Sequence, residues 1–353
     1  MAWLEVRLDT TSEAIDWVRT LLVGAIDPQD LHITNYLDSE LSNLDSVEAS
    51  QPAIWEFTIL LYFPEDGRSR TRLDHLEQTL APLYRTGLTT EMQVAIVEEK
   101  LLVPNNLWQP VGERFVILSA DSDLGGEKTR IPLIIKPSLA FGSGLHPATM
   151  LSLQMLERHV LPGMHTLDLG SGSGILTVAM AKLGATVLAL DNDPIAVLAT
   201  QEAIDLNQVS TQAIAQAGSL GGGNNLGHWL GGDVADCSNR SFDQVPTVNN
   251  QANTQVALQG KFDLVMANIF ARIHIALATD FYHALQQDDP RQNSYNKNRG
   301  ILITTGFTKD QEEDVIIACQ KTGFELIDRL YQDQWVALVL QTHSKLQSTK
   351  LQS

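Results

Sequence analysis

The sequence predicts an α/β protein in which a mostly parallel, doubly wound sheet follows a small α+β domain. Over residues 166–183 a short apolar run, three alternating glycines and a helical repeat follow one another, which is the order strand, tight turn, helix. A second apolar run ends at Asp191 and completes half of a nucleotide-binding, Rossmann-like βαβ unit. A third observation, the element order βαββαβ before residue 100, predicts a ferredoxin-like domain.

The N-terminal domain, residues 1–100, is predicted from six elements. Alternating side chains at residues 2–9 indicate a half-buried strand, and β-forming residues at 54–63, stopped by Pro64, indicate another. The other elements are strands at 32–37 and 92–97, a helix after Thr10–Glu13 and a helix over Leu73–Leu83. Because the domain carries no catalytic constellation, we expect it to serve substrate recognition, with a purely structural role as the alternative.

Residues 101–135 are predicted to be a linker that contains a hairpin. Phe115–Leu118 and Ile131–Ile135 have the composition of strands, and a polar loop at 120–130 separates them. We expect two strands joined in this way to pair antiparallel.

A flexible surface insertion is predicted within the second domain, which is expected over residues 136–342. Residues 208–260 are rich in Gly, Asn, Gln and Ser, which favours a solvated segment over packed elements. Asp288–Arg299 is a second polar insertion, and residues 343–353 are predicted to be a disordered tail. A substrate-gripping arm is the alternative for the long insertion.

The glycine turn indicates which ligand the second domain binds. Gly170, Gly172 and Gly174 lack a Cβ, so a ligand can lie against their backbone while the next helix directs free N–H groups at it. A dinucleotide fingerprint would need a glycine where Ile175 stands. The spacing G-x-G-x-G after Asp168 instead resembles the first motif of S-adenosylmethionine-dependent methyltransferases. A dehydrogenase and a βαβ unit without a ligand are the alternatives.

Two strand ends are predicted to place polar groups in the same crevice. Asp191 can accept hydrogen bonds from a ribose diol. Phe262–Asn268 is typical of a buried parallel strand, and the Asn268 amide can orient a cofactor or an incoming amine because it both donates and accepts. Asp168 is a candidate for holding a methionine ammonium group, with stabilisation of the turn as the alternative.

The negative net charge of the chain limits which molecules it is expected to bind. The formal net charge is −18, and residues 1–100 contribute −11 of it from 18 acidic and 7 basic side chains. Such a surface repels phosphate backbones and favours basic partners, with improved solubility as the alternative explanation. We therefore expect a basic protein substrate and no direct nucleic-acid partner.

The remaining composition points to a cytoplasmic enzyme. The apolar runs are far shorter than a membrane span, and the N-terminus lacks the shape of a signal peptide. Cys237 and Cys319 are the only cysteines, too few for a disulfide framework or a zinc site. We expect a monomer without a metal or a membrane partner.

Several motifs together identify a family resemblance. Phe141-Gly-Ser-Gly-Leu-His-Pro-Ala-Thr149, followed by Asp168–Gly174, closely resembles the PrmA family, the methyltransferases of ribosomal large-subunit protein eleven. The family motifs D-x-D-P, A-N-I and E-W-V-A-L have counterparts at Asp191–Pro194, Ala267–Ile269 and Gln334–Leu338. The resemblance covers residues 136–340 by motif and the N-terminus more weakly. The loop departs from the family pattern at Lys136, Ser138, Ser143 and Ala148.

The resemblance implies a class I methyltransferase fold with S-adenosyl-L-methionine as cofactor. It carries cofactor contacts onto Thr149, Gly170, Asp191 and Asn268. The full set of candidate cofactor-binding residues is Thr149, Gly170, Asp191, Asn268, Asp168, Gly172 and Phe141. The candidate catalytic residues are Asn268 and His146, and for His146 the alternative role is ordering of the loop.

The resulting hypothesis is a protein (lysine) N-methyltransferase that acts on lysine ε-amines or the N-terminal α-amine of a ribosomal large-subunit protein. The amine must be neutral to attack, although free lysine has a pKa of about 10.4. Desolvation near the positive sulfonium would lower that pKa, and we expect bulk water to be the final proton acceptor. The alternatives are a methyltransferase of another protein or of RNA with the same fold, and a non-catalytic cofactor-binding protein.

Overall fold

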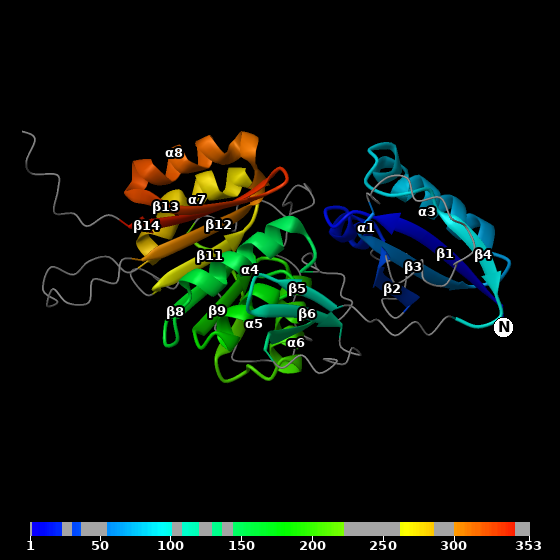
Figure 1. Cartoon of the computed structure of the whole chain (residues 1–353), viewed down its shortest axis with the longest axis horizontal. Coiled ribbons are helices and arrows are strands. Elements are labelled where there is room, and N and C mark those ends of the chain that lie inside the picture. Colours follow the sequence, from blue (N-terminus) through cyan, green and yellow to red (C-terminus); the bar gives the residue numbers. More distant parts are fainter. Residues whose placement is uncertain are drawn as a thin grey trace, which may run out of the picture.

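The computed structural model describes eight stretches of the chain, within which three β-sheets form (Figure 1). A four-stranded sheet comes from the N-terminal part of the chain, and a three-stranded and a seven-stranded sheet come from the rest. The described residues are 2–22, 30–36, 55–100, 108–119, 129–135, 144–221, 262–285 and 300–342.

The N-terminal sheet has the strand order β2-β3-β1-β4, and neighbouring strands are antiparallel. Its strands are β1 (Trp3–Thr10), β2 (Leu31–Asn35), β3 (Phe57–Pro64) and β4 (Gln93–Val97). Helices α1 (Ile15–Leu21) and α3 (Ser69–Arg85) pack with apolar side chains of the strands in one core. The element order and the strand order confirm the predicted ferredoxin-like domain.

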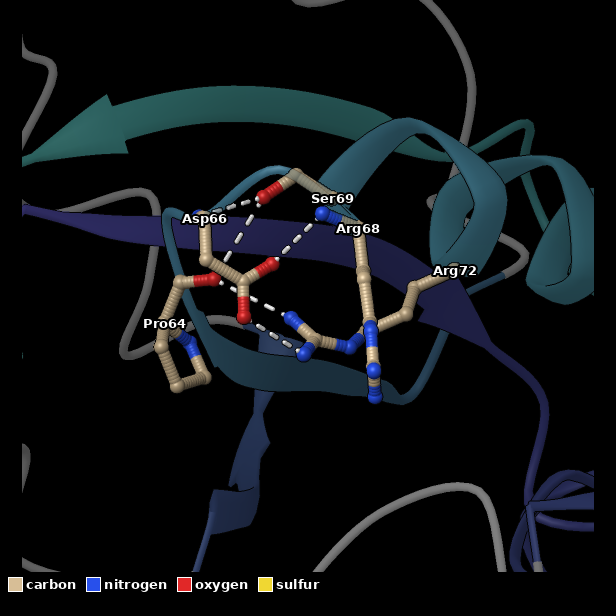
Figure 2. Close-up of polar contacts among 5 residues, drawn as sticks. All are labelled: Pro64, Asp66, Arg68, Ser69 and Arg72. Atoms are coloured by element: carbon tan, nitrogen blue, oxygen red, sulfur yellow. Dashed lines mark hydrogen bonds and ion pairs between the residues drawn. The ribbon is translucent and has the colours of Figure 1, made fainter.

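The turn between β3 and α3 shows how local sequence sets the start of a helix (Figure 2). The Asp66 carboxylate accepts hydrogen bonds from Arg68 N and from Arg72 Nη2, both at 2.8 Å. Ser69 Oγ accepts from Asp66 N at 2.8 Å, and Arg72 Nη1 donates to Pro64 O at 3.2 Å. The Arg72 hydrogen bond, followed by the Arg68 amide, favours the charged carboxylate and lowers the pKa of Asp66. The end of β3 is thereby tied to the first turn of α3.

The larger sheet has the order β10-β9-β8-β11-β12-β14-β13. Strands β8 to β12 run parallel, whereas β14 lies antiparallel between β12 and β13. The strand order reverses between β8 and β11, which confirms the mostly parallel, doubly wound sheet. The strands are β8 (His165–Leu169), β9 (Thr186–Asp191), β10 (Ala213–Ala217), β11 (Leu264–Asn268), β12 (Ile301–Thr308), β13 (Phe324–Gln332) and β14 (Trp335–Thr342).

Helices cover both faces of this sheet, α7 and α8 on one side and α4 and α5 on the other (Figure 1). The two faces have separate apolar cores. The central strand β11 contributes to both, whereas the apolar residues of β8 belong to the core beneath α7 and α8. Burial on both faces explains the near-continuous apolar sequence of β11. The helices are α4 (Pro147–His159), α5 (Ile175–Lys182), α6 (Pro194–Leu206), α7 (Ala271–Ala284) and α8 (Glu312–Thr322), with a 3-10 turn η4 (Lys309–Gln311) before α8.

The predicted hairpin between Phe115–Leu118 and Ile131–Ile135 is wrong. Strand β6 (Phe115–Ser119) pairs antiparallel with β5 (Trp108–Val111) and parallel with β7 (Ile131–Ile135). The hairpin instead turns at Gly112, whose positive φ of 57° suits a tight turn. The connection between β6 and β7 is long enough to return the chain to the same end of the sheet, which gives a parallel pair.

Strand β7 is fastened to the helices of the larger sheet. Asn207, at the end of α6, accepts a hydrogen bond from Ile134 N at 2.9 Å and donates to Ile134 O at 2.8 Å, as a neighbouring strand would. Lys182 Nζ donates to Pro132 O at 2.5 Å and to Asn207 Oδ1 at 2.9 Å, and burial lowers the pKa of Lys182 to about 8. The strand that leads into the glycine-rich loop is therefore held in place at two points.

The predicted flexible insertion at 208–260 is wrong at its start. Residues Ala213–Ala217 form β10, the edge strand beside β9, with Ala213 opposite Val187. An edge strand needs few large apolar residues because only one strand flanks it. The composition of this segment therefore did not indicate a strand. Residues 222–261 lie outside the described residues, as do the whole predicted insertion at 288–299 and the whole predicted tail at 343–353.

Candidate functional site

The candidate site lies where the strand order of the larger sheet reverses. Asp168, near the end of β8, stands beside Ala189 of β9 and Met266 of β11 in the parallel register. Asp191 and Asn268 are the last residues of β9 and β11. The carboxyl ends of strands at such a switch point form the ligand crevice of an open α/β sheet. The structure thus brings together three side chains that the sequence predicted separately.

The glycine turn after β8 adopts a backbone that other residues resist. Gly170, Gly172 and Gly174 have φ values of 75°, 53° and 80°. A Cβ on Gly170 would lie 2.6 Å from Ile269 Cγ2, so this position needs both the left-handed conformation and the missing side chain. Thr200 Oγ1 donates to Gly172 O at 3.1 Å and fastens the turn to α6.

Asp191 is oriented toward the glycine turn by backbone amides. Its carboxylate oxygens accept hydrogen bonds from Gly172 N at 3.0 Å and from Asp193 N at 2.9 Å. Burial raises the pKa of Asp191, and the backbone hydrogen bonds from Asp193 and Gly172 oppose this effect. A carboxylate has about four acceptor positions, so this anchored group retains capacity for a ligand's hydroxyl groups.

Asp168 is fully buried and only half satisfied within the described part of the chain. Its Oδ2 accepts a hydrogen bond from Thr177 Oγ1 at 2.5 Å, whereas Oδ1 has no hydrogen-bond partner there. Burial raises the pKa of Asp168 to about 7, and the negative charge of Asp191 adds to the effect. A buried acceptor of this kind suits a cationic donor from a ligand, such as an ammonium group.

Asn268, at the end of β11, and Thr149, on α4, contact each other at the site. Asn268 Nδ2 donates to Thr149 Oγ1, in the first turn of α4, at 3.3 Å. Behind Asn268, a Cβ on Gly306 of β12 would lie 2.7 Å from both Ile269 N and Ile269 O and 2.8 Å from Asn268 Oδ1. The absence of a side chain at Gly306 therefore lets the end of β11 reach its observed position.

His146 caps helix α4 from a buried position. Its Nδ1 accepts a hydrogen bond from Ala148 N at 3.2 Å, and its ring meets that of Trp335 edge-on at 4.4 Å. Burial lowers the pKa of His146, and the charge of Asp16 on α1 partly offsets this effect. The observed contacts support the loop-ordering role that was the alternative for this residue.

The N-terminal helix α1 reaches the same region. Glu13, just before α1, accepts a hydrogen bond from Gln334 Nε2 at 3.0 Å, and burial raises the pKa of Glu13. Ile15 is fully buried in the apolar core that also contains Leu145 and Met150. The N-terminal part of the chain thus contacts the elements that frame His146.

Most of the predicted site residues lie together, and several of their partners escaped prediction. Phe141 lies outside the described residues, together with Lys136, Ser138 and Ser143. The missed residues are Thr177, Thr200 and Gly306, which hold Asp168, the glycine turn and Asn268 respectively. The hydroxyl of Thr177 in the first turn after the glycines was the only local signal, because the other contacts join distant segments.

Among the described residues no group of three or more His, Cys, Asp or Glu side chains could hold a metal ion. None of the helices in the described ranges combines the length and the apolar character needed to cross a bilayer.

The family model, the relatives and the solved structure described below all point to one protein family. A sequence model of the family described as ribosomal protein L11 methyltransferase (PrmA) matches residues 2–224 and 235–343. The ribosomal protein L11 methyltransferase of Chloroflexus aurantiacus is 34% identical over 350 residues, 96% of this chain and 97% of the relative. The protein of the same name from Herpetosiphon aurantiacus is 33% identical, over 98% and 99% of the two chains. A crystal structure of ribosomal protein L11 methylase from Lactobacillus delbrueckii subsp. bulgaricus has a TM-score of 0.50 and 25% identity, over 67% of this chain and 99% of that one.

Proposed function

Because this chain belongs to the ribosomal protein L11 methyltransferase (PrmA) family, we propose that it methylates amino groups of ribosomal protein L11. Its cofactor is S-adenosyl-L-methionine, which supplies a methyl group on a sulfonium whose thioether leaves readily. Positioning therefore provides most of the catalysis that the protein must add. The observation that carries the proposal is that two acids meet at one glycine turn. Asp191 is an anchored acceptor, and Asp168 is buried with an Oδ1 that has no hydrogen-bond partner among the described residues.

The described residues fit this cofactor. Asp191 is held by Gly172 N so that its remaining acceptor positions can take the ribose hydroxyls. Gly170 gives the methionine portion access to the backbone, and Asp168 Oδ1 accepts from its ammonium group. Thr149 and Asn268 are proposed to contact the cofactor from the opposite side.

The substrate amine is proposed to meet Asn268. The Asn268 side-chain oxygen can accept a hydrogen bond from a neutral amine and direct its lone pair, while Nδ2 is held by Thr149. Methyl transfer to an amine then leaves a proton on nitrogen, which passes to bulk water. Because Nδ1 of His146 is engaged with Ala148 N, we assign His146 to ordering the loop.

The N-terminal domain is proposed to capture the substrate. Its net charge of −11 complements a basic ribosomal protein, and its helix α1 contacts the catalytic domain beside His146. We propose lysine ε-amines or the N-terminal α-amine as acceptors, and a monomeric enzyme that works in the cytoplasm without contacting nucleic acid or membrane.

The cofactor affinity is expected to fall as the pH falls through about 7. The pKa of Asp168 is raised to about 7 in the folded chain, so the group is protonated below that pH and accepts less well from an ammonium group. A single group with this pKa would weaken binding roughly 20-fold between about pH 7.5 and pH 5.5. Calorimetric titration of the wild type and of Asp168→Asn measures the effect. The variant should bind weakly with little dependence on pH, and an equally steep profile in both would contradict the assignment.

The raised pKa of Asp168 also determines whether the free energy of unfolding of the cofactor-free protein rises or falls with pH. Because the folded pKa of Asp168 lies above the ordinary value of 3.8, its contribution to stability is full below that value and is lost as the pH rises toward 7. Asp168→Asn should remove this component, so the difference in unfolding free energy between variant and wild type should shift in favour of the variant from about pH 4 to 7. Denaturant melts at each pH test the direction.

His146→Ala is expected to reduce stability and cofactor affinity together. Loss of a cap costs about 1 kcal/mol, and loss of the contact with Trp335 loosens the loop before α4. The matched control is His159→Ala at the other end of α4, where the ring bonds Asp328. Cofactor titration and single-turnover rates separate the two roles. A large rate loss at unchanged cofactor affinity would make His146 a general base and contradict the loop-ordering assignment.

The proposed function is tested by methyl transfer from labelled S-adenosylmethionine into undermethylated ribosomal proteins and free ribosomal RNA, side by side. Label in ribosomal protein L11, lost in Asp191→Ala, is the expected result. Label in RNA would overturn the assignment of the substrate while keeping the fold. No label in either, with cofactor still bound, would overturn the proposed activity.

A further inference from the structure

Strand β4 (Gln93–Val97) is an edge strand of the N-terminal sheet as far as the described residues show. All of its residues pair with β1 on one side, in a regular register from Trp3–Val97 to Arg7–Gln93. On its other side no strand pairs with it within the described ranges. The outward N–H and C=O groups of such a strand can pair with another chain.

The side chains of β4 leave apolar surface in solvent. Ile96 is 65% exposed and Val94 is 47% exposed. They stand opposite Leu4 and Val6 of β1, which lie in the core beneath the helices, so they share the helix-covered face of the sheet. The apolar core therefore continues to the margin of the domain, where α1 and α3 no longer cover it.

Natural edge strands are usually protected against pairing, and β4 lacks three of the features that do so. It contains no proline or lysine, and its pairing with β1 has no bulge. The opposite edge strand, β2 (Leu31–Asn35), is different, because its residues are buried or half-buried. The exposure is thus specific to the β4 edge.

Acidic side chains stand at both ends of this edge. Glu91 precedes β4, and Glu98 and Glu99 follow it, all three exposed. The edge thus has an apolar centre and negative ends, which matches an extended segment with apolar residues between basic ones.

We propose that β4 is the docking edge for the substrate protein, which adds a basic, extended segment to the sheet as a fifth strand. This inference rests on the proposed function and specifies how the substrate is held. Main-chain hydrogen bonds to β4 give affinity, Val94 and Ile96 give side-chain contacts, and the flanking glutamates select basic residues. Docking here leaves the rest of the substrate to reach the catalytic domain.

A second copy of this chain is a poorer occupant. If two β4 strands paired antiparallel around Ala95, Glu91 of each would stand opposite Glu99 of the other, and Gln93 opposite Val97. Like charges directly opposite one another destabilise a strand pair. Repulsion at both ends therefore disfavours self-pairing and favours a basic partner.

The test combines substrate kinetics with hydrogen exchange on the full-length enzyme. Ile96→Lys removes the most exposed apolar contact and adds a charge that repels a basic segment, so the KM for ribosomal protein L11 should rise roughly 10-fold. The cofactor affinity and kcat should stay unchanged. The control is Ile317→Lys on α8, where Ile317 is 40% exposed. The double variant Val94→Thr/Ile96→Thr keeps β-forming residues and guards against misfolding, and its KM should rise as well.

Hydrogen exchange identifies the edge directly. In the complex with ribosomal protein L11, the amides of Gln93–Val97 should gain protection, because the outward ones acquire partners. Unchanged KM in both β4 variants together with unchanged exchange at β4 would overturn the docking edge while leaving methylation intact. Failure of the wild type to methylate ribosomal protein L11 would instead overturn the proposed function. A dimer in sedimentation that Ile96→Lys abolishes would assign the edge to self-association and contradict the inference.

Discussion

Replacing Asp191 with alanine is expected to weaken cofactor binding about 100-fold, since a hydrogen bond to a charged group is worth about 1.5–3 kcal/mol. Two effects add. The ribose loses its acceptor, and Gly172 N loses the carboxylate that holds the glycine turn, at 3.0 Å. Asp191→Asn keeps the shape and one acceptor oxygen, so its affinity should lie between those of the wild type and the alanine variant.

Calorimetric titration with S-adenosylmethionine and its demethylated product measures this loss. The control is Asp205→Ala on α6, whose carboxylate bonds only Gln201 and Ser210 among the described side chains. That variant should bind cofactor as the wild type does. If Asp191→Ala kept its affinity and lost only turnover, Asp191 would have a role in the chemical step and the ribose assignment would be wrong.

Replacing Gly306 with alanine is expected to destabilise the fold by about 3 kcal/mol or more, from a backbone in the left-handed region and a collision with the backbone that follows β11. Gly306 has a φ of 90°, and its new Cβ would meet Ile269 N and O at 2.7 Å. Because these contacts are backbone atoms of the segment after β11, relief requires that the segment move. Asn268 moves with it, so kcat should fall as well.

Gly163→Ala provides the matched control. Gly163 has a φ of 85°, yet a Cβ there would meet no atom within 4 Å. It should therefore show only the conformational cost, about 1–2 kcal/mol, with unchanged activity. Denaturant unfolding of both variants separates strain from collision. Equal losses of stability, with full activity in Gly306→Ala, would show that the packing of Gly306 against Ile269 does not position Asn268.

The predictions that succeeded rest on local rules. The glycine turn between β8 and α5 follows from three alternating glycines between an apolar run and a helical repeat, which need no distant partner to be recognised. The four strands and two helices of the N-terminal domain were predicted from periodicity and from the composition and stop signals of short segments. Asp191 and Asn268 were predicted to end parallel strands, and the structure places both at strand ends.

The predictions that failed concern pairing between segments. The strand character of Phe115–Ser119 and Ile131–Ile135 was visible, but their parallel pairing was not, because pairing depends on the path of the connection. Strand β10 (Ala213–Ala217) was missed because an edge strand can form without many large apolar residues. The two hydrogen bonds between Asn207 and Ile134 join residues far apart in the chain, so no local sequence pattern predicts them.

The sequence by itself determined the fold class, the family and the residues at the strand ends, since each depends on composition and spacing within a short window. Only the tertiary structure decided the surroundings of those residues. Packing removed water from Asp168 and raised its pKa, turned His146 into a buried cap beside Trp335, and left Ile96 uncovered at the β4 edge. Burial and exposure are properties of surfaces that meet after folding, so they follow from the arrangement of elements and not from the order of residues.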